Sequence, residues 1–353
     1  RLALGTDECQ EVTMLNERRR RVLTALVDEY VASVQPVGSK VLVERYGLGF
    51  SSATVRSDLQ ALEEAGHVYQ PHVSAGRVPT DSGYRVFVDD VVSDEVTSID
   101  TREAESVRLR FASLEHELSD ILRETSLLLS RLTSYVAVVA APTLRRARIR
   151  RVSVVPLGTR RASVVVVTDS GQVANRTVEF DRPVTPETVA RVEEYLSRTL
   201  DGAVGEQVED VRTAMEDVEA SEASIALAVL DDVLECLAEA DHDRVLTGGV
   251  SALLTHPEFN DPGVVRPLVG LLEDGITMLT VLSDVMRSPH VQVRIGHENP
   301  VGALEHASFV AARYGDGESG GIVGLIGPTR MDYRRAISAV RVVSESLSDV
   351  IGS

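Results

Sequence analysis

Cysteine is scarce in this sequence, and long apolar runs are absent. The two cysteines, Cys9 and Cys236, are far apart, and neither has a second cysteine or a histidine at metal-ligand spacing. This argues against a disulfide or zinc framework. No apolar stretch reaches the roughly 20 residues of a membrane-spanning helix, and no basic segment followed by an apolar one marks a leader. We therefore expect a cytoplasmic protein without membrane contacts.

Catalytic constellations are missing as well. No Ser-His-Asp order, carboxylate pair or phosphate-binding loop stands out, and the eight histidines are scattered singly. The spacing Gly315-x-Gly317-x-x-Gly320 matches a dinucleotide fingerprint, but it leads into an apolar strand, residues 322–326, where the fingerprint needs a helix. We expect no enzyme, no cofactor and no metal.

The chain as a whole has fewer basic than acidic residues, but one segment near its N-terminal end does not. The net charge is −18, although contacts with DNA phosphates need Lys and Arg. Residues 15–88 hold nine Arg or Lys against eight acids, a net of +1, whereas residues 89–353 carry −17. The acidity of the larger part repels DNA, so residues 15–88 are the only credible nucleic-acid surface.

The chain length of 353 residues, with 43% hydrophobic and 25% charged residues, predicts two or three folded domains. Residues 1–14 show no periodicity, and we expect a disordered extension there. A helical pattern begins at Leu15 and ends at the Pro36-Val37-Gly38 break, and Ser39 is expected to cap a short second helix. After a Gly-containing turn, Ser51 or Ser52 caps a third helix.

Val55, Leu59 and Leu62 give this third helix one apolar stripe. Two short strands then follow, at residues 67–70 and 76–79. Helix, short helix, turn and capped helix is the order of a helix-turn-helix, and the strands predict a wing. The alternative is a small helical bundle with an incidental hairpin; the order and the serine cap favour a winged helix over residues 15–90.

Two blocks of sequence resemble a known family. Residues 36–89, PVGSKVLVERYGLGFSSATVRSDLQALEEAGHVYQPHVSAGRVPTDSGYRVFVD, closely resemble the N-terminal domain of the heat-inducible transcription repressor family HrcA. Residues 324–340, GLIGPTRMDYRRAISAV, resemble that family's C-terminal signature. Between the blocks the chain matches only in general character.

The rest of the chain alternates between strand and helix patterns. Residues 91–112 look like a linker followed by the start of a helix, which runs to about Leu132. The runs YVAVVAAP, IRRVSVVPLG, ASVVVVTDSG and VANRTVEF read as strands, and continuous valine at 164–167 predicts a strand covered on both faces. Residues 185–276 read as helical, and strands return in HVQVRIG, ASFVAARYG and GGIVGLIGP before a final helix at 333–351.

Strands, then helices, then strands indicate an insertion into a sheet domain. The resemblance implies a GAF-like sheet domain interrupted by a helical dimerisation insert. The expected fold class is α+β and multidomain: a winged helix-turn-helix, then a GAF-like antiparallel-sheet domain at 113–200 and 275–353, with the insert at 201–274. We expect the insert to dimerise through an apolar stripe that comprises Ile225, Leu227, Val229, Leu230, Val233, Leu234 and Leu237.

The predicted DNA-binding residues fall in three places. On the third helix, six residues lie off the apolar stripe near its N-terminal end, where residues of a recognition helix enter the major groove: Ser52, Ala53, Thr54, Arg56, Ser57 and Gln60. Arg56 suits guanine and Gln60 suits adenine. On the second helix Ser39, Lys40 and Arg45 suit phosphates. On the wing His72, Ser74 and Arg77 could reach the backbone or minor groove. A solvated polar face is the alternative throughout.

In the C-terminal block, Thr329 or Asp332 is expected to cap the final helix, with Arg330 nearby. The resemblance implies a repressor that binds, as a homodimer, an inverted-repeat operator in double-stranded DNA upstream of heat-shock genes, and that depends on the chaperonin GroEL. The alternative is a metabolite-sensing regulator whose GAF-like domain is the ligand pocket.

Overall fold

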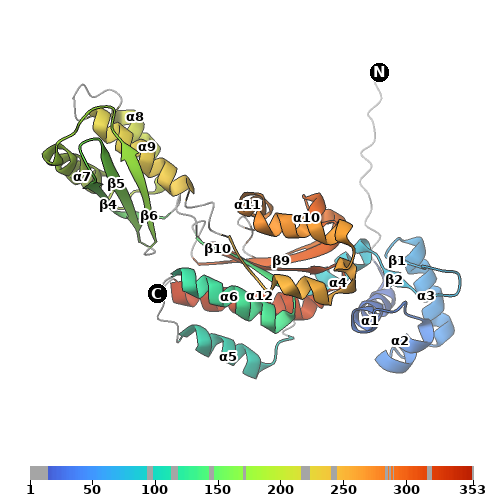
Figure 1. Ribbon diagram of the computed structural model, residues 1–353. Coiled ribbons are helices and arrows are strands. Elements are labelled where there is room, and N and C mark those ends of the chain that lie inside the picture. The colour runs from blue at the N-terminus through green and yellow to red at the C-terminus, as the bar shows by residue number, and fades with distance from the viewer. Residues whose placement is uncertain are drawn as a thin grey trace, which may run out of the picture. The chain divides into compact units, whose positions relative to one another are not determined.

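The computed structural model (Figure 1) describes residues 15–93, 98–112, 118–142, 147–169, 172–215, 223–239, 245–282, 285, 288, 290–315 and 320–351. The extension expected at residues 1–14, with Cys9, lies outside these ranges. The chain divides into two units, Arg1–Glu95 and Val96–Ser353. No described helix is long and apolar enough to cross a membrane.

The first unit contains four helices and a short hairpin among its described residues. Its elements are α1 (Glu17–Ser33), α2 (Ser39–Tyr46), α3 (Ser52–Glu64), β1 (Val68–Tyr69), β2 (Val78–Pro79) and α4 (Asp81–Ser93). The first five match the predicted order of helices and strands. β1 and β2 are antiparallel, with Val68 opposite Pro79.

Side-chain caps start two of these helices. The side chain of Asn16 accepts a hydrogen bond from the Arg19 amide, and that of Ser51 accepts one from the Thr54 amide, so each satisfies an N–H that the helix leaves free. The predicted cap at Ser39 is wrong. Gly38 precedes α2 without a side-chain cap, and Ser39 is buried in the first turn.

The predicted linker at 91–112 is mostly helical. α4 continues to Ser93, and its Phe87, Val88 and Val91 are buried. In the second unit α5 (Thr101–Ala112) buries Val107 and Phe111. The charged residues around these positions lie on exposed faces of the two helices, which is why the composition suggested a linker.

A five-stranded antiparallel sheet forms the centre of the second unit. Its order is β7-β3-β10-β9-β8, and its strands are β3 (Val136–Ala140), β7 (Val245–Gly248), β8 (Gln292–Ile295), β9 (Ala307–Tyr314) and β10 (Gly321–Pro328). Four of them were predicted. β7 was not, because its four residues lie in a stretch read as helical. Figure 1 shows helices on both faces of this sheet.

The helices around the sheet form two layers. α6 (Leu118–Thr133) and α12 (Tyr333–Ile351) pack on one face, and α5 packs against α12 on the side away from the sheet (Figure 1). On the other face, α10 (Pro262–Glu273) and α11 (Gly275–Leu282) share a core with Phe309 and Ile326. Short 3-10 turns complete this side: η2 (Val250–Thr255), η3 (Pro257–Phe259), η5 (Gly296–Glu298) and η6 (Gly302–Leu304).

A second lobe interrupts this sheet between β3 and β7. Its described residues form a three-stranded antiparallel sheet, ordered β4-β5-β6, and three helices. These elements are β4 (Ile149–Pro156), β5 (Arg161–Thr168), β6 (Val173–Glu179), α7 (Pro186–Leu200), α8 (Gly205–Met215) and α9 (Ala223–Glu239). β3 and β7 are neighbours, with Ala140 opposite Val245, so both ends of the insertion meet at one edge of the five-stranded sheet.

The predicted boundaries of the insert at 201 and 274 therefore need correction. The interruption begins before β4, and α10 belongs to the core of the five-stranded sheet. Valine-rich strands look alike whichever sheet they join, so the pattern could not assign β4 to β6. The expected α+β class with antiparallel sheets is confirmed.

β5 is covered on one face only, contrary to the prediction for residues 164–167. Val164 and Val166 are buried, whereas Val165 and Val167 are partly exposed. α7 and α9 fill the buried side of this sheet, and the apolar stripe of α9 lies in the same core. Val155 and Val173 are exposed on the opposite face, at 49% and 60%.

Tight packing of β7 against α6 gives a test of the fold. Gly249 has φ +70°, and a Cβ there would lie 1.7 Å from Ser130 Oγ. Gly249→Ala should lower the free energy of unfolding by about 2 to 4 kcal/mol, because strain and overpacking add. Gly270→Ala is the matched control: it lies inside α10 with open space around it, and should raise stability by about 0.5 to 1 kcal/mol. Urea denaturation measures both, and equal midpoints would contradict this packing.

Candidate nucleic-acid interface

α3 has one buried side and one exposed side. Val55, Asp58, Leu59 and Leu62 are buried. The opposite side is exposed to solvent and carries four of the predicted DNA-binding residues, Ala53, Arg56, Ser57 and Gln60, together with Glu64, which was not predicted. The helix thus offers a row of short side chains flanking one guanidinium. Gln60 Nε2 donates a hydrogen bond to Glu64 Oε1 at 3.1 Å.

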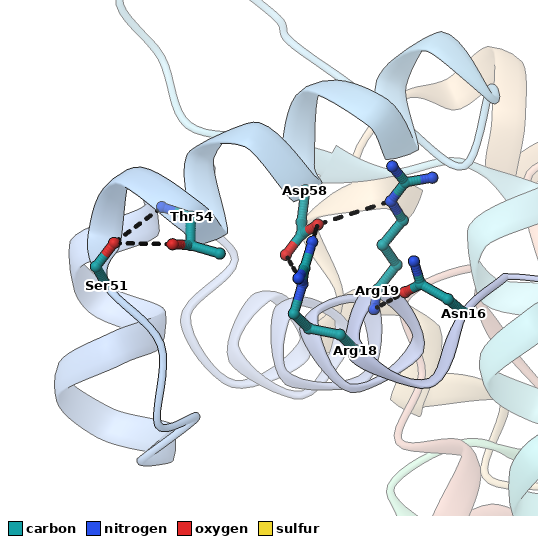
Figure 2. A network of polar contacts seen from close by, with 6 residues as sticks. All are labelled: Asn16, Arg18, Arg19, Ser51, Thr54 and Asp58. Atoms are coloured by element: carbon teal, nitrogen blue, oxygen red, sulfur yellow. Dashed lines mark hydrogen bonds and ion pairs between the residues drawn. The ribbon is translucent and has the colours of Figure 1, made fainter.

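The other predicted residues at the start of α3 are held by hydrogen bonds. Thr54 Oγ1 lies 2.9 Å from Ser51 Oγ, and Figure 2 shows both groups at the N-terminal end of the helix. Ser52 Oγ lies 2.9 Å from Ser39 Oγ on α2. The Ser39–Ser52 contact therefore connects α2 to the first turn of α3, and Thr54 is bonded within the start of α3 itself. Ser39 is buried, and Ser52 and Thr54 are partly exposed.

Lys40, Arg45 and Arg56 are the exposed cations of the predicted set. Among the described residues Lys40 and Arg56 make no ion pair. Arg45, predicted to contact phosphate, is engaged instead: its Nη1 donates to Glu29 Oε1 at 2.6 Å, and the Glu29 side chain is 7% exposed. This pair connects the end of α2 to α1.

The hairpin places its predicted residues in two different environments. His72 and Ser74 are exposed in the turn. Arg77 is only 19% exposed, and its Nη2 pairs with Glu63 Oε2 at 2.8 Å. Its backbone also exchanges hydrogen bonds with Val37 in both directions. Arg77, predicted to reach DNA from the wing, thus also joins the hairpin to the end of α3.

Two apolar side chains of the hairpin escaped prediction. Val73 is 98% exposed and Tyr69 is 48% exposed. The pattern of alternating strand residues could have indicated Tyr69, whose neighbour Val68 is buried. Nothing in the turn sequence singled out Val73.

Two arginines of the string on α1, Arg18 and Arg19, point toward Asp58 of the third helix (Figure 2), although both side chains stay partly open to solvent. Arg18 donates to both carboxylate oxygens of Asp58, from Nε and Nη2, each at 2.8 Å. Arg19 Nε lies 3.6 Å from the same carboxylate. The carboxylate raises the pKa of Arg18 further. Sequence reasoning missed this role, although Asp58 stands three residues after Val55 and four before Leu62, within the buried stripe.

Two more arginines of the string also have partners. Arg20 pairs with Asp90 on α4 at 3.0 Å. Arg18 and Arg21 lie over the ring of Phe50, 5.8 and 5.9 Å from its centroid, at cation–π distance. The positive charge of the first unit is therefore largely used within that unit. Arg21, Lys40 and Arg56 remain as its described cations with no carboxylate partner.

The comparisons with known proteins extend along almost the whole chain. The family model described as HrcA protein C terminal domain matches residues 119–337. A relative from Nocardioides sp., named Heat-inducible transcription repressor HrcA, is 40% identical over 341 residues, covering 96% of this chain and 99% of the relative. The chain belongs to the HrcA family. A relative of the same name from Frankia casuarinae is 39% identical over 343 residues, covering 96% and 100%.

The HrcA family also has a structural relative among solved proteins. The crystal structure of a hypothetical protein at 2.2 Å resolution has 25% sequence identity and a TM-score of 0.61, and the match covers 96% of this chain and 99% of that one. The two chains therefore share their fold through both units.

The C-terminal block that resembles the HrcA signature is a structural junction. Asp332 accepts from the Arg335 amide at 3.0 Å and so caps α12, as predicted for Thr329 or Asp332. Arg330, 13% exposed, forms an ion pair with Glu258. The Asp332 amide donates to Tyr135 Oη. These contacts join the end of β10 to η3 and to the start of β3. The described residues contain no cluster of metal-ligating side chains.

The junction of α1 and α2 in this HrcA family member gives a pH-dependent test. Burial, followed by the negative charge of Glu29, raises the pKa of Tyr46 to about 12 from 10.0. Between these values the unfolded chain releases the phenol proton first, so stability falls as pH rises through this window. Tyr46→Phe should remove the part of this pH-dependent loss of stability that comes from the phenol. Urea midpoints at pH 9 and 11 for both proteins measure it, and parallel losses would contradict the assignment.

Proposed function

We propose that the chain is a sequence-specific transcription repressor of heat-shock genes, and that its first unit is a winged helix that reads DNA. The observation that carries this proposal is the exposed side of α3, where Arg56 projects among Ala53, Ser57 and Gln60. Membership of the HrcA family supports it, because the relatives are named heat-inducible transcription repressors.

The exposed side of α3 suits the floor of a major groove. Short side chains allow a helix to approach base edges, and an arginine among them can donate two hydrogen bonds to guanine. Gln60 can turn from Glu64 to an adenine. Ser52 and Thr54 lie at the N-terminal end of the helix, where free backbone N–H groups favour a phosphate.

Phosphate contacts flank this surface. Lys40 on α2 is exposed and has no described carboxylate partner, so its ammonium group is available to a phosphate. Ser39 fixes the α2–α3 turn, and His72 and Ser74 on the hairpin face solvent beside exposed Val73. Arg77, which pairs with Glu63, has the role of setting the angle of the hairpin.

The operator is an inverted repeat bound by a homodimer. A two-fold dimer places two recognition helices about one DNA turn, or a multiple of it, apart. We assign the dimer contact to the inserted lobe, but not to the stripe on α9, which is used in the core of that lobe. Val155 and Val173, exposed on the open face of the three-stranded sheet, support another surface of the same lobe.

The five-stranded sheet, in the role of the GAF-like domain, is a structural core in this proposal. Its described strands bury apolar side chains such as Val138 and Phe309 on one face and Val139 and Leu325 on the other. This filling favours a role in stability over the metabolite-sensing alternative. Control then comes from heat and from the chaperonin GroEL, which acts on the folding of the repressor.

Removal of the Arg56 guanidinium tests the reading surface. Arg56→Ala should weaken operator binding by about 1 to 3 kcal/mol and relax preference at one base pair per half-site. The matched control is Arg102→Ala, which deletes the same charge from an exposed position on α5. Fluorescence anisotropy with operator duplexes at fixed salt measures both. Equal affinities for the two variants, with folds intact, would remove Arg56 from the interface.

Excision of the lobe tests the dimer. Since Ala140 lies opposite Val245, residues 142–244 can be replaced by a four-residue turn containing Asn-Gly. The product should be a folded monomer that binds the operator about a hundredfold more weakly, because the second half-site contact is lost. Sedimentation velocity gives the mass. A dimer of the excised chain would place the interface elsewhere.

Heating tests the proposed control. A few polar contacts, such as those of Asp58 with Arg18 and Glu29 with Arg45, refine the packing of the first unit, so operator occupancy should fall at temperatures below the loss of helical circular dichroism. Addition of GroEL and ATP after heating should restore occupancy. Constant occupancy up to global unfolding, together with indifference to GroEL, would argue for a different kind of control.

A further inference from the structure

A charged residue interrupts the buried side of α3. The Asp58 side chain is 2% exposed and lies among the apolar residues that pack this helix onto the unit. An isolated carboxylate is costly to bury, and an apolar residue at this position would keep the stripe continuous. The charge is matched by Arg18 at two points and by Arg19 at 3.6 Å.

The geometry of the Arg18–Asp58 pair restrains the orientation of α3. Two parallel hydrogen bonds between planar groups fix the direction of the carboxylate as well as its distance (Figure 2). Apolar contacts are non-directional and allow a helix to turn slightly about its axis. The pair therefore supplies an angular restraint that Val55, Leu59 and Leu62 cannot supply.

That restraint acts on the exposed side of the same helix turn. At about 100° per residue, Arg56 projects about 200° from Asp58, on the opposite side. A rotation of α3 by about 20° would move side-chain atoms at a radius of about 6 Å by about 2 Å. A shift of that size breaks hydrogen bonds to a base edge, whose distances span a few tenths of an ångström.

Arg18 also restrains the start of the helix. Its guanidinium lies 5.8 Å from the centroid of the Phe50 ring, and Phe50 immediately precedes the N-cap Ser51. Arg21 lies 5.9 Å from that centroid. One residue of α1 thus contacts α3 at its middle and the segment that enters it.

We propose that Asp58 and Arg18 are positioning residues for sequence discrimination: the pair sets the rotation of α3, and with it the register of Arg56 and its neighbours against base edges. This inference rests on the proposed function. Phosphate contacts tolerate small rotations because Lys and Arg side chains are long. Loss of the pair should therefore reduce operator binding more than binding to random DNA.

The first unit contains a matched pair for comparison. Glu29 is buried like Asp58 and pairs with Arg45 at 2.6 Å, but it connects α1 to the end of α2. Asp58→Asn and Glu29→Gln each remove one buried charge and keep the size of the side chain. Both should lower thermal stability, and only the first should change discrimination. Arg18→Lys keeps the charge and loses the two-point geometry.

The experiment uses the full chain and two probes at one salt concentration: a duplex enriched from random DNA by the wild-type chain, and an unselected duplex of equal length. Discrimination is the ratio of the two affinities. We expect about a tenfold loss for Asp58→Asn and for Arg18→Lys, mostly through the enriched duplex, and less than a twofold change for Glu29→Gln.

Three outcomes would overturn the inference. The first is an unchanged ratio in folded Asp58→Asn. The second is an equal fall in both affinities, the pattern expected of a purely structural residue. The third is an equal loss of discrimination in Glu29→Gln. If Asp58→Asn does not fold, Arg18→Lys decides by the same ratio. A wild-type chain that enriches no duplex would overturn the proposed function as well, so the two failures are distinguishable.

Discussion

The burial of one side of α3 is the constraint on which the candidate interface depends. Val55, Leu59 and Leu62 are buried in the core of the first unit. Because this side of the helix is buried, the opposite side faces solvent, and Arg56 lies on that exposed side. The capping of the helix by Ser51 and its contact with Arg18 through Asp58 fix where the outward side begins and which way it points. Apolar burial drives the packing, and polar contacts refine its angle.

A second constraint organises the larger unit. β3 needs partners on both sides, and it finds them in β10 and β7, which lie much later in the chain. Since the pairing brings Ala140 beside Val245, a lobe of about a hundred residues can be inserted without disturbing the sheet. The lobe has its own core, in which α7 and α9 cover one face of β4 to β6. This division allows the proposed assembly and the proposed DNA reading to reside in different parts of the chain.

The periodicity of the sequence predicted most helices and strands. It failed where two different structures, such as strands of two separate sheets, give the same pattern. The serine cap, the stripe of α3 and the outward position of Arg56 could be predicted, because they depend on spacing within one helix. Features that depend on residues distant in sequence could not be predicted. These are the partner of Asp58, the pairing of Arg77 with Glu63 and the membership of β4 in a separate sheet. β7 was not predicted, because it is short and lies in a stretch whose pattern is helical.

Selection from random DNA by the full chain at defined salt tests the central claim most directly. The account predicts that the enriched duplexes share an inverted repeat, with half-sites separated by about one helical turn of DNA or a multiple of it, and that footprinting protects both halves. Recovery of no common sequence, or of single asymmetric sites bound by one chain, would contradict the account of a dimer that reads DNA through α3.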